Sequence, residues 1–178
     1  MRTEWVAKLT LPVGERDHIQ GPATAPITLV EYGDYQCPYC GQAYPIVKEL
    51  QKQLGKRLRF VFRNFQLSTM HPYAEHAAEA AETAGAHGKF WEMHDMLYEN
   101  QEALDDEDLV QYAGAVGLDP SRFASEFAKH AHAARVREDF MSGARSGVNG
   151  TPTFFINGVR HDDSFDPDTL LKAMEAAL

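Results

Sequence analysis

The chain has 178 residues, of which 44% are hydrophobic and 11% aromatic, and its formal net charge is −9 at pH 7. This length and composition predict one globular domain, or one domain with a sizeable insertion, whose core forms without crosslinks. The negative charge argues against nucleic-acid or anionic-membrane partners. No apolar run approaches the ~20 residues that would cross a bilayer, and the N-terminus lacks the pattern of a secretory signal. We expect a cytoplasmic monomer, or a periplasmic or membrane-tethered domain if the chain is trimmed from a longer protein.

The first part of the chain predicts a β-α-β unit. Residues 27–33 (ITLVEYG) and 58–63 (LRFVFR) are largely apolar and rich in β-branched or aromatic side chains, as buried strands are. Between them, apolar residues recur on one face over residues 38–54, which indicates a helix. This order implies parallel strands joined by a right-handed crossover. Residues 1–26 form a lead-in, in which we expect a short strand near residues 9–13.

The middle of the chain predicts helices, and its end predicts a hairpin and a last helix. Periodicity and capping signals indicate helices near 71–86, 89–99, 105–116 and 131–144, and one that starts at Asp119-Pro120. After them come a strand at 153–156, a hairpin turn at Asn157-Gly158, a strand at 159–161 and a helix opened by Asp166-Pro167. We therefore expect residues 66–147 to form a helical insertion between two parts of one sheet domain, 1–65 and 148–178.

The only two cysteines, Cys37 and Cys40, form a CPYC motif where the first predicted strand gives way to the helix. A cysteine in the first turn of a helix lies near unpaired N–H groups and the positive end of the dipole, which favour the thiolate. Pro38 suits the first helical position, where its missing N–H costs nothing. Cys40 lies one turn on, close enough to attack a disulfide that Cys37 has formed. The motif predicts a thiol–disulfide exchange site.

A CxxC pair is also half of a common zinc site. The chain has eight histidines, but only His130 and His132 are closely spaced, and a helix would point them to opposite sides. The proline after Cys37 and the helix behind Cys40 also differ from a zinc knuckle. We expect no metal at this motif or elsewhere.

Three segments together resemble one known family. They are EYGDYQCPYCG (31–41), the helical region 71–100 and GVNGTPTFFING (147–158). The chain resembles the DsbA-like thiol–disulfide oxidoreductases, and the likeness extends over nearly its whole length. The resemblance implies an α/β protein with a thioredoxin-like fold, in which a mixed central sheet is flanked by helices and carries an inserted all-helical subdomain.

The resemblance also implies roles for individual residues. Cys37 would be the nucleophile and Cys40 the resolving cysteine, with Pro38 and Tyr39 facing the substrate. The Thr151–Pro152 bond would be cis and lie beside Cys37, because an X–Pro bond has lost most of its trans preference. The backbone of Thr151 would then pair with an extended substrate. An ordinary trans turn at this site is the alternative.

Other polar residues near the motif have two interpretations each. Glu31 stands where the family carries a buried acid, which would exchange a proton with Cys40; alternatively it is a strand-edge glutamate in water. Tyr39 replaces the histidine of the family's strongest oxidants, so we expect a less oxidising disulfide. We expect His94 to be a packed side chain and Arg63 to be a solvated strand end.

These residues predict an enzyme that exchanges its dithiol or disulfide with protein thiols and disulfides through a mixed disulfide at Cys37. Neither a metal nor an organic cofactor is needed, and the redox partner and the direction of transfer stay open. The Pro-Tyr dipeptide is typical of glutaredoxins and favours an alternative, a reductase with glutathione as co-substrate. A further alternative is a redox-responsive binding domain, since similar domains are appended to membrane transporters.

Overall fold

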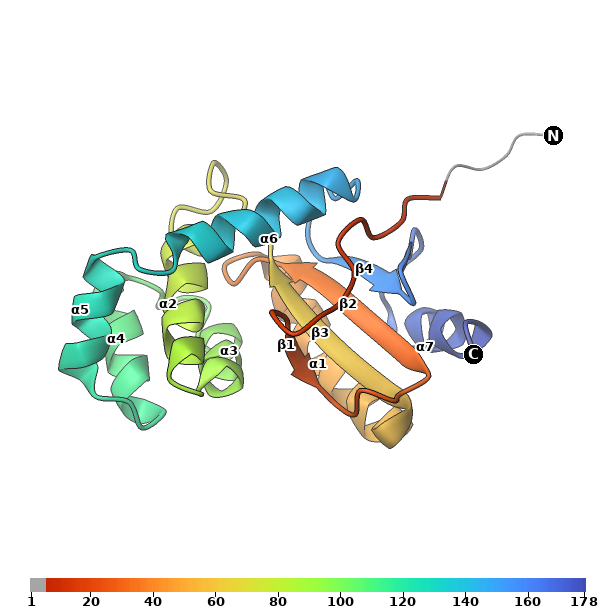
Figure 1. Ribbon diagram of the computed structural model, residues 1–178, viewed down its shortest axis with the longest axis horizontal. Coiled ribbons are helices and arrows are strands. Elements are labelled where there is room, and N and C mark those ends of the chain that lie inside the picture. Colours follow the sequence, from red (N-terminus) through yellow and green to blue (C-terminus); the bar gives the residue numbers. More distant parts are fainter. Residues whose placement is uncertain (1–5) are drawn as a thin grey trace.

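A five-stranded mixed sheet organises the computed structural model, which describes residues 6–178 (Figure 1). The strand order is β1-β3-β2-β4-β5, with β2 and β3 parallel and the other pairs antiparallel. The strands are β1 (His18–Gln20), β2 (Ile27–Gly33), β3 (Leu58–Asn64), β4 (Thr153–Ile156) and β5 (Val159–Arg160). The predicted β-α-β unit and the terminal hairpin are thus confirmed, and β2 and β3 are buried on both faces as their largely apolar sequences indicated.

The prediction of a strand near residues 9–13 is wrong, because the short N-terminal strand is β1 instead. Pro12 has no N–H to donate to a ladder. The carbonyl groups of Leu11 and Pro12 accept hydrogen bonds from the Arg63 side chain rather than from a strand. In the described part of this lead-in, residues 6–26, Lys8 forms the one isolated bridge, to Val159.

Helices cover both faces of the sheet. Because successive side chains of a strand point to opposite faces, the core consists of one cluster on each face. Leu29 of β2 points toward α1 (Pro38–Leu54) and α7 (Pro167–Ala176), in a cluster that continues into the insertion. Val30 and Tyr32 point the other way, toward α6 (Ala133–Arg145) and the lead-in, where Phe140 packs. Figure 1 shows α6 crossing the sheet on the side opposite α1.

Four further helices lie beside the sheet, and α2 is central among them (Figure 1). They are α2 (Ala74–Ala86), α3 (Phe90–Glu99), α4 (Asp106–Ala115) and α5 (Pro120–Ala128). The many alanines of α2 let α3, α4, α5 and α6 approach it closely. The predicted N-caps are present, since the carboxylates of Asp119 and Asp166 accept N–H groups of the first turns of α5 and α7. The division at residues 66 and 147 stays a prediction.

Arg63 is buried, which contradicts the expectation of a solvated strand end. Its side chain is 1% exposed and makes an ion pair of 2.8 Å with Asp17, while Nη1 donates to Tyr32 Oη and to Leu11 O. Burial alone would lower the pKa of Arg63, but the bonds to Asp17 and Tyr32 raise it, so the guanidinium stays charged. Arg63 therefore ties the lead-in to the sheet.

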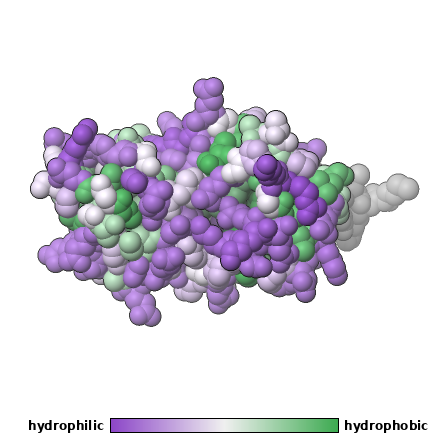
Figure 2. Space-filling model, turned by 90° about the horizontal axis from the view of Figure 1, so that it is seen from below, coloured by the Kyte–Doolittle hydropathy of each residue, from purple (hydrophilic) through white to green (hydrophobic). Residues whose placement is uncertain are grey.

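The face of the molecule that Figure 2 shows is largely polar, with separate small apolar areas. This agrees with the net charge of −9. Among residues 6–178, no helix combines the length and the apolar character needed to cross a bilayer.

Candidate active site

The CPYC motif lies where β2 ends and α1 begins. Cys37 is the N-cap residue of α1, with an extended backbone (φ −66°, ψ 124°), and Pro38 opens the helix. Both cysteines are free thiols; Cys37 is 3% exposed and Cys40 is fully buried, whereas Tyr39 between them is 61% exposed. The motif thus presents Pro38 and Tyr39 to solvent and shields the second sulfur beneath them.

The two thiols differ strongly in acidity. The hydrogen bond from the Cys40 thiol is the main cause that lowers the pKa of Cys37 from 9.0 to about 5. Burial opposes this shift, while the Thr151 side chain and the N–H groups of Cys40 and Tyr39 support it. Burial raises the pKa of Cys40 far above its ordinary value, and the negative charges of Glu31 and Cys37 add to that effect. At neutral pH the first sulfur is a thiolate and the second a thiol.

The acidity of Cys37 can be tested by alkylation with iodoacetamide across pH. The rate should follow a thiolate with a pKa of about 5, well below the ~8.5 of a free cysteine. Because the Cys40 thiol supplies the main hydrogen bond, Cys40→Ala should raise the midpoint by a unit or more. Cys40→Ser keeps a donor and should raise it less. A midpoint near that of free cysteine in the parent chain would contradict the assignment.

The Thr151–Pro152 peptide bond is cis, as the sequence analysis predicted. Residue pairing of β4 with β2 places this segment next to the end of β2, and the Cys37 thiol lies 3.7 Å from the Thr151 carbonyl oxygen. Within residues 6–178 the Thr151 hydroxyl has no other hydrogen-bond partner, so it is available to the Cys37 thiolate. The Thr-Pro segment and the nucleophilic sulfur therefore form one site.

Asp34, which was not among the predicted site residues, organises the loop before Cys37. Its Oδ1 accepts the N–H groups of Gln36 at 2.8 Å and Cys37 at 3.2 Å. Its Oδ2 accepts the N–H of Leu67 at 2.9 Å and bonds to Nδ1 of His71 at 2.8 Å. An aspartate three residues before a helix cap is a local signal for the first pair of bonds. The second pair, which joins the loop to the start of the insertion, depends on the fold.

The insertion also contributes to the site through Gln101, Met70 and Tyr73. Gln101 Nε2 donates to the backbone oxygens of Tyr35 and Cys37, both at 2.9 Å. Met70 and Tyr73 are 69% and 48% exposed, and the Tyr73 N–H donates to the Gln36 side chain in the active-site loop. Tyr73 therefore lies beside the active-site loop, and Met70 is the residue before His71, which bonds to Asp34 of that loop.

Glu31 is buried under the motif, which excludes the interpretation of a glutamate facing water. It is 2% exposed, and its Oε1 has no hydrogen-bond partner within residues 6–178. Burial first, and then the charge of Cys37, raise the pKa of Glu31 from 4.5 to about 8. The carboxyl can therefore gain and lose a proton near neutral pH.

His94 is a packed side chain, as expected. It is 3% exposed, its Nδ1 bonds to Tyr35 Oη at 2.9 Å, and burial lowers its pKa well below 6.5. The ring is therefore neutral and forms part of the aromatic core behind the active site.

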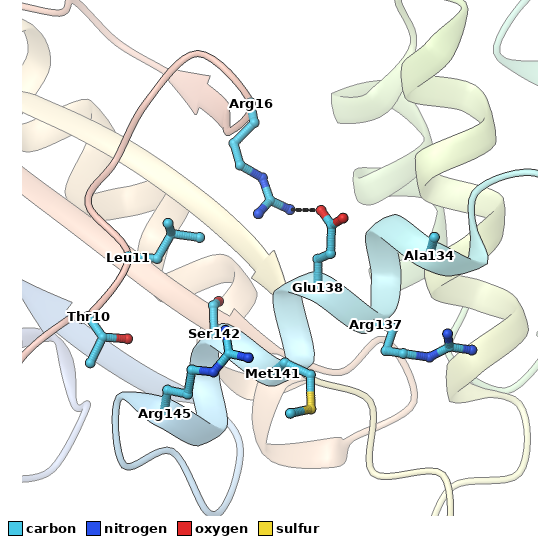
Figure 3. Close-up of a pocket in the computed structure, with 9 residues that line it drawn as sticks. All are labelled: Thr10, Leu11, Arg16, Ala134, Arg137, Glu138, Met141, Ser142 and Arg145. Carbon is cyan, nitrogen blue, oxygen red and sulfur yellow. Dashed lines mark ion pairs between the residues drawn. The ribbon is translucent and has the colours of Figure 1, made fainter.

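A cavity of about 560 Å³ lies elsewhere, between the lead-in and α6 (Figure 3). Arg16 points across it to Glu138 at 3.3 Å, and Arg137 and Arg145 belong to its lining. The lining includes neither cysteine, so this cavity is separate from the thiol chemistry.

The sheet order, the helical insertion and the CPYC–cis-proline site together define a thioredoxin fold of the DsbA-like kind. The thioredoxin family model matches residues 14–176, and the chain belongs to this family. In structure it is similar to oxidised BdbD from Bacillus subtilis, with a TM-score of 0.85, 24% identity, and 96% and 97% of the two chains covered. It is also similar to the thiol-disulfide exchange protein alpha-DsbA2 from Wolbachia pipientis, with a TM-score of 0.77, 18% identity, and 92% and 88% covered.

In sequence the chain is similar to part of a longer protein. It is 47% identical over 176 residues to the Na(+)/H(+) antiporter NhaA 1 of Salinispora arenicola. The aligned region covers 98% of this chain and 27% of that protein. The chain therefore spans about a quarter of the length of the curated relatives that it matches.

Proposed function

We propose that the chain exchanges disulfides with protein substrates through a mixed disulfide at Cys37. The observation that carries this proposal is the contrast between an acidic Cys37 and a buried, weakly acidic Cys40. A thiolate is the attacking species in disulfide exchange, and a low pKa also makes it a good leaving group. The pair thus supplies both properties without a metal or an organic cofactor.

In the reducing direction, the Cys37 thiolate attacks one sulfur of a substrate disulfide. The substrate S–S bond breaks, a Cys37–substrate disulfide forms and one substrate thiolate leaves. Cys40 then loses its proton and attacks the Cys37 sulfur, so that the Cys37–Cys40 disulfide forms and the second substrate thiolate leaves. Two electrons pass to the substrate, whose thiolates take up protons. Oxidation of a substrate dithiol is the reverse sequence.

Glu31 is the proposed proton acceptor for Cys40. Its pKa of about 8 allows it to take a proton near neutral pH and to release it again. The Glu31 charge also raises the pKa of Cys40, so the two groups act on each other electrostatically. The substrate backbone is proposed to pair with Thr151, whose segment continues the line of β4, and apolar substrate side chains to contact Tyr39, Met70 and Tyr73.

The pKa of Cys37 also bears on direction. A stable thiolate favours the reduced form, which makes the disulfide oxidising. A value of about 5 lies between ~3.5 for a strong oxidant and ~7 for a reductant. We propose an oxidant of intermediate strength, in line with the tyrosine rather than histidine at position 39. Glutathione stays a candidate co-substrate.

A second candidate function is a redox-responsive domain of a membrane transporter, which the likeness to part of an Na(+)/H(+) antiporter favours. In that case the state of the Cys37–Cys40 pair would change the affinity for a partner, and turnover would be incidental.

A Cys40→Ser chain tests the first proposal against the second. Without the resolving sulfur, an exchange enzyme should accumulate mixed disulfides at Cys37 with a disulfide-containing model protein, whereas Cys37→Ser should accumulate none. Mass spectrometry of the trapped species after acid quenching identifies the linked cysteine. A Cys40→Ser chain that traps no substrate would favour the binding domain.

A further inference from the structure

Three side chains of metal-ligating type meet within the insertion, in residues that the thiol site does not use. His76 and Glu79 are three residues apart on α2 and share one face of it. His130 comes from the link between α5 and α6. One nitrogen of each imidazole and one carboxylate oxygen of Glu79 lie within 4.8 Å of one another. The segments that carry them are neighbours in Figure 1.

Contacts around the cluster hold the imidazoles in place. His76 Nδ1 lies 2.7 Å from Oδ1 of Asp106 in the first turn of α4, and the His76 ring packs edge-on against Phe127 at 5.6 Å. A histidine that donates one N–H to a carboxylate keeps a lone pair on its other nitrogen. This carboxylate–histidine arrangement is common behind metal-bound imidazoles.

Glu79 is the buried member of the cluster. Its side chain is 4% exposed, and within residues 6–178 its only ion-pair partner is His130, at 2.8 Å. A buried carboxylate needs a positive charge close by. A metal cation held between the two imidazoles and the carboxylate would supply that charge at a distance that the three ligand atoms already share.

The backbone of His130 has an unusual conformation that fixes the direction of its side chain. Its φ is 52°, in the left-handed region that non-glycine residues rarely adopt. Among residues 6–178 the only other such residue is Asn157, in the hairpin turn that favours it. In this conformation the His130 side chain lies against Glu79, 51 residues earlier in the sequence.

We propose that His76, Glu79 and His130 bind one Zn²⁺ ion. Two imidazoles and a carboxylate are a ligand set that suits zinc, with a water completing four-coordination, whereas Ca²⁺ and Mg²⁺ prefer oxygen ligands alone. The ion would connect α2 to the α5–α6 link, and through Asp106 to α4. Its expected role is to stabilise the insertion that borders the CPYC motif.

Zinc binding can be measured by competition with a chromophoric chelator. The Cys37→Ser/Cys40→Ser chain is the parent, because free thiolates also bind zinc, and any affinity tag is removed. One Zn²⁺ should bind per chain. His76→Ala and His130→Ala should weaken binding at least ~10-fold, and Asp106→Asn by ~10-fold or more through the orientation of His76. His132→Ala, next to the site but outside the ligand set, is the matched control and should bind as the parent does.

A second measurement does not depend on the chelator. Zinc should raise the melting temperature of the parent and of His132→Ala, and leave that of His130→Ala unchanged. Affinity should fall as the pH is lowered, because protons compete with the metal ion for its ligands. Absence of zinc binding by the folded parent, or equal binding by the parent and all three site variants, would overturn the proposal. Circular dichroism confirms that each variant is folded, and Asp106→Asn tests the site if an alanine variant is not.

Discussion

Replacing Arg63 by methionine is expected to lower the free energy of unfolding by about 3–5 kcal/mol. Methionine retains much of the apolar volume, but it leaves the Asp17 carboxylate without its partner, in a place where the side chain is 2% exposed. A buried charge that has lost its counter-ion costs far more than a surface pair is worth. The hydrogen bonds to Tyr32 and Leu11 are lost as well.

The pH dependence of the stability loss shows whether the unpaired Asp17 charge causes it. Burial would raise the pKa of Asp17, but the bonds to Arg63 lower it below 3.8, so this carboxylate stabilises the parent above its unfolded pKa and the contribution is lost as pH falls. In Arg63→Met the unpaired carboxylate should instead take up a proton more readily, so the deficit should shrink toward acid pH. Urea unfolding of the two chains at several pH values gives the difference directly.

Two further variants test whether the loss of stability comes from the unpaired charge. Arg63→Met/Asp17→Asn removes the unpaired charge and should recover a large part of the loss. Arg59→Met makes the same substitution on the same strand, where the arginine is half-buried and donates to Thr28 Oγ1; it should cost less than about 1 kcal/mol. A single variant at position 63 that costs no more than Arg59→Met would contradict the role of Arg63 as a buried anchor.

Elements whose sequence signals act over a few residues were predicted correctly, whereas features that depend on distant parts of the chain were not. The apolar runs of β2 and β3, the N-caps Asp119 and Asp166 and the Asn157-Gly158 turn act within a few residues, and each was predicted in place. β1 is three residues long and depends on pairing with β3, so no periodicity marks it. Arg63 lies in an apolar run, but only the position of Asp17 shows that the charge is buried.

The residues of the candidate site also divide into those marked by the sequence and those that depend on the fold. Cys37, Cys40 and the Thr151-Pro152 segment are marked by residue type and by the family pattern, and the structure places them together. Asp34 and Gln101 bind the same loop, and only the bonds of Asp34 Oδ1 have a local signal, the position of the aspartate three residues before the helix cap. The contacts of Asp34 Oδ2 and of Gln101 join the sheet domain to the insertion, so they became visible only in the fold.

Replacing Glu31 by glutamine is expected to slow the attack of Cys40 on the mixed disulfide by about 100-fold, the lower range for loss of a general base. Glutamine has nearly the same size but cannot accept the proton of Cys40. The rate can be followed as release of a chromophoric aryl thiol from a mixed disulfide at Cys37. In the parent it should rise as Glu31 loses its proton, with a midpoint below about 8, because the Cys37 thiolate that helps to raise the pKa of Glu31 to that value is absent from the mixed disulfide. In Glu31→Gln this rise should be absent. Glu49→Gln, an exposed site on α1, is the control and should leave the profile unchanged.

The same substitution should stabilise the reduced chain in alkali. Burial first, and then the Cys37 thiolate, raise the pKa of Glu31 from 4.5 to about 8. The folded state therefore keeps a proton that the unfolded state releases between these values, and stability falls as pH rises through that window. Each pKa unit is worth about 1.4 kcal/mol, so above about pH 8 the Glu31 charge should cost on the order of 4–5 kcal/mol.

Glu31→Gln should thus unfold at a higher urea concentration than the parent at about pH 9. The two should unfold at nearly the same concentration at about pH 4.5, where Glu31 is protonated in the folded state and about half protonated in the unfolded state. A structural role alone would change stability equally at both pH values and leave the resolving step intact. Slower resolution together with higher stability in alkali is the combination that a buried proton acceptor requires. A variant that resolves as fast as the parent would exclude Glu31 from the proton transfer, whatever its effect on stability.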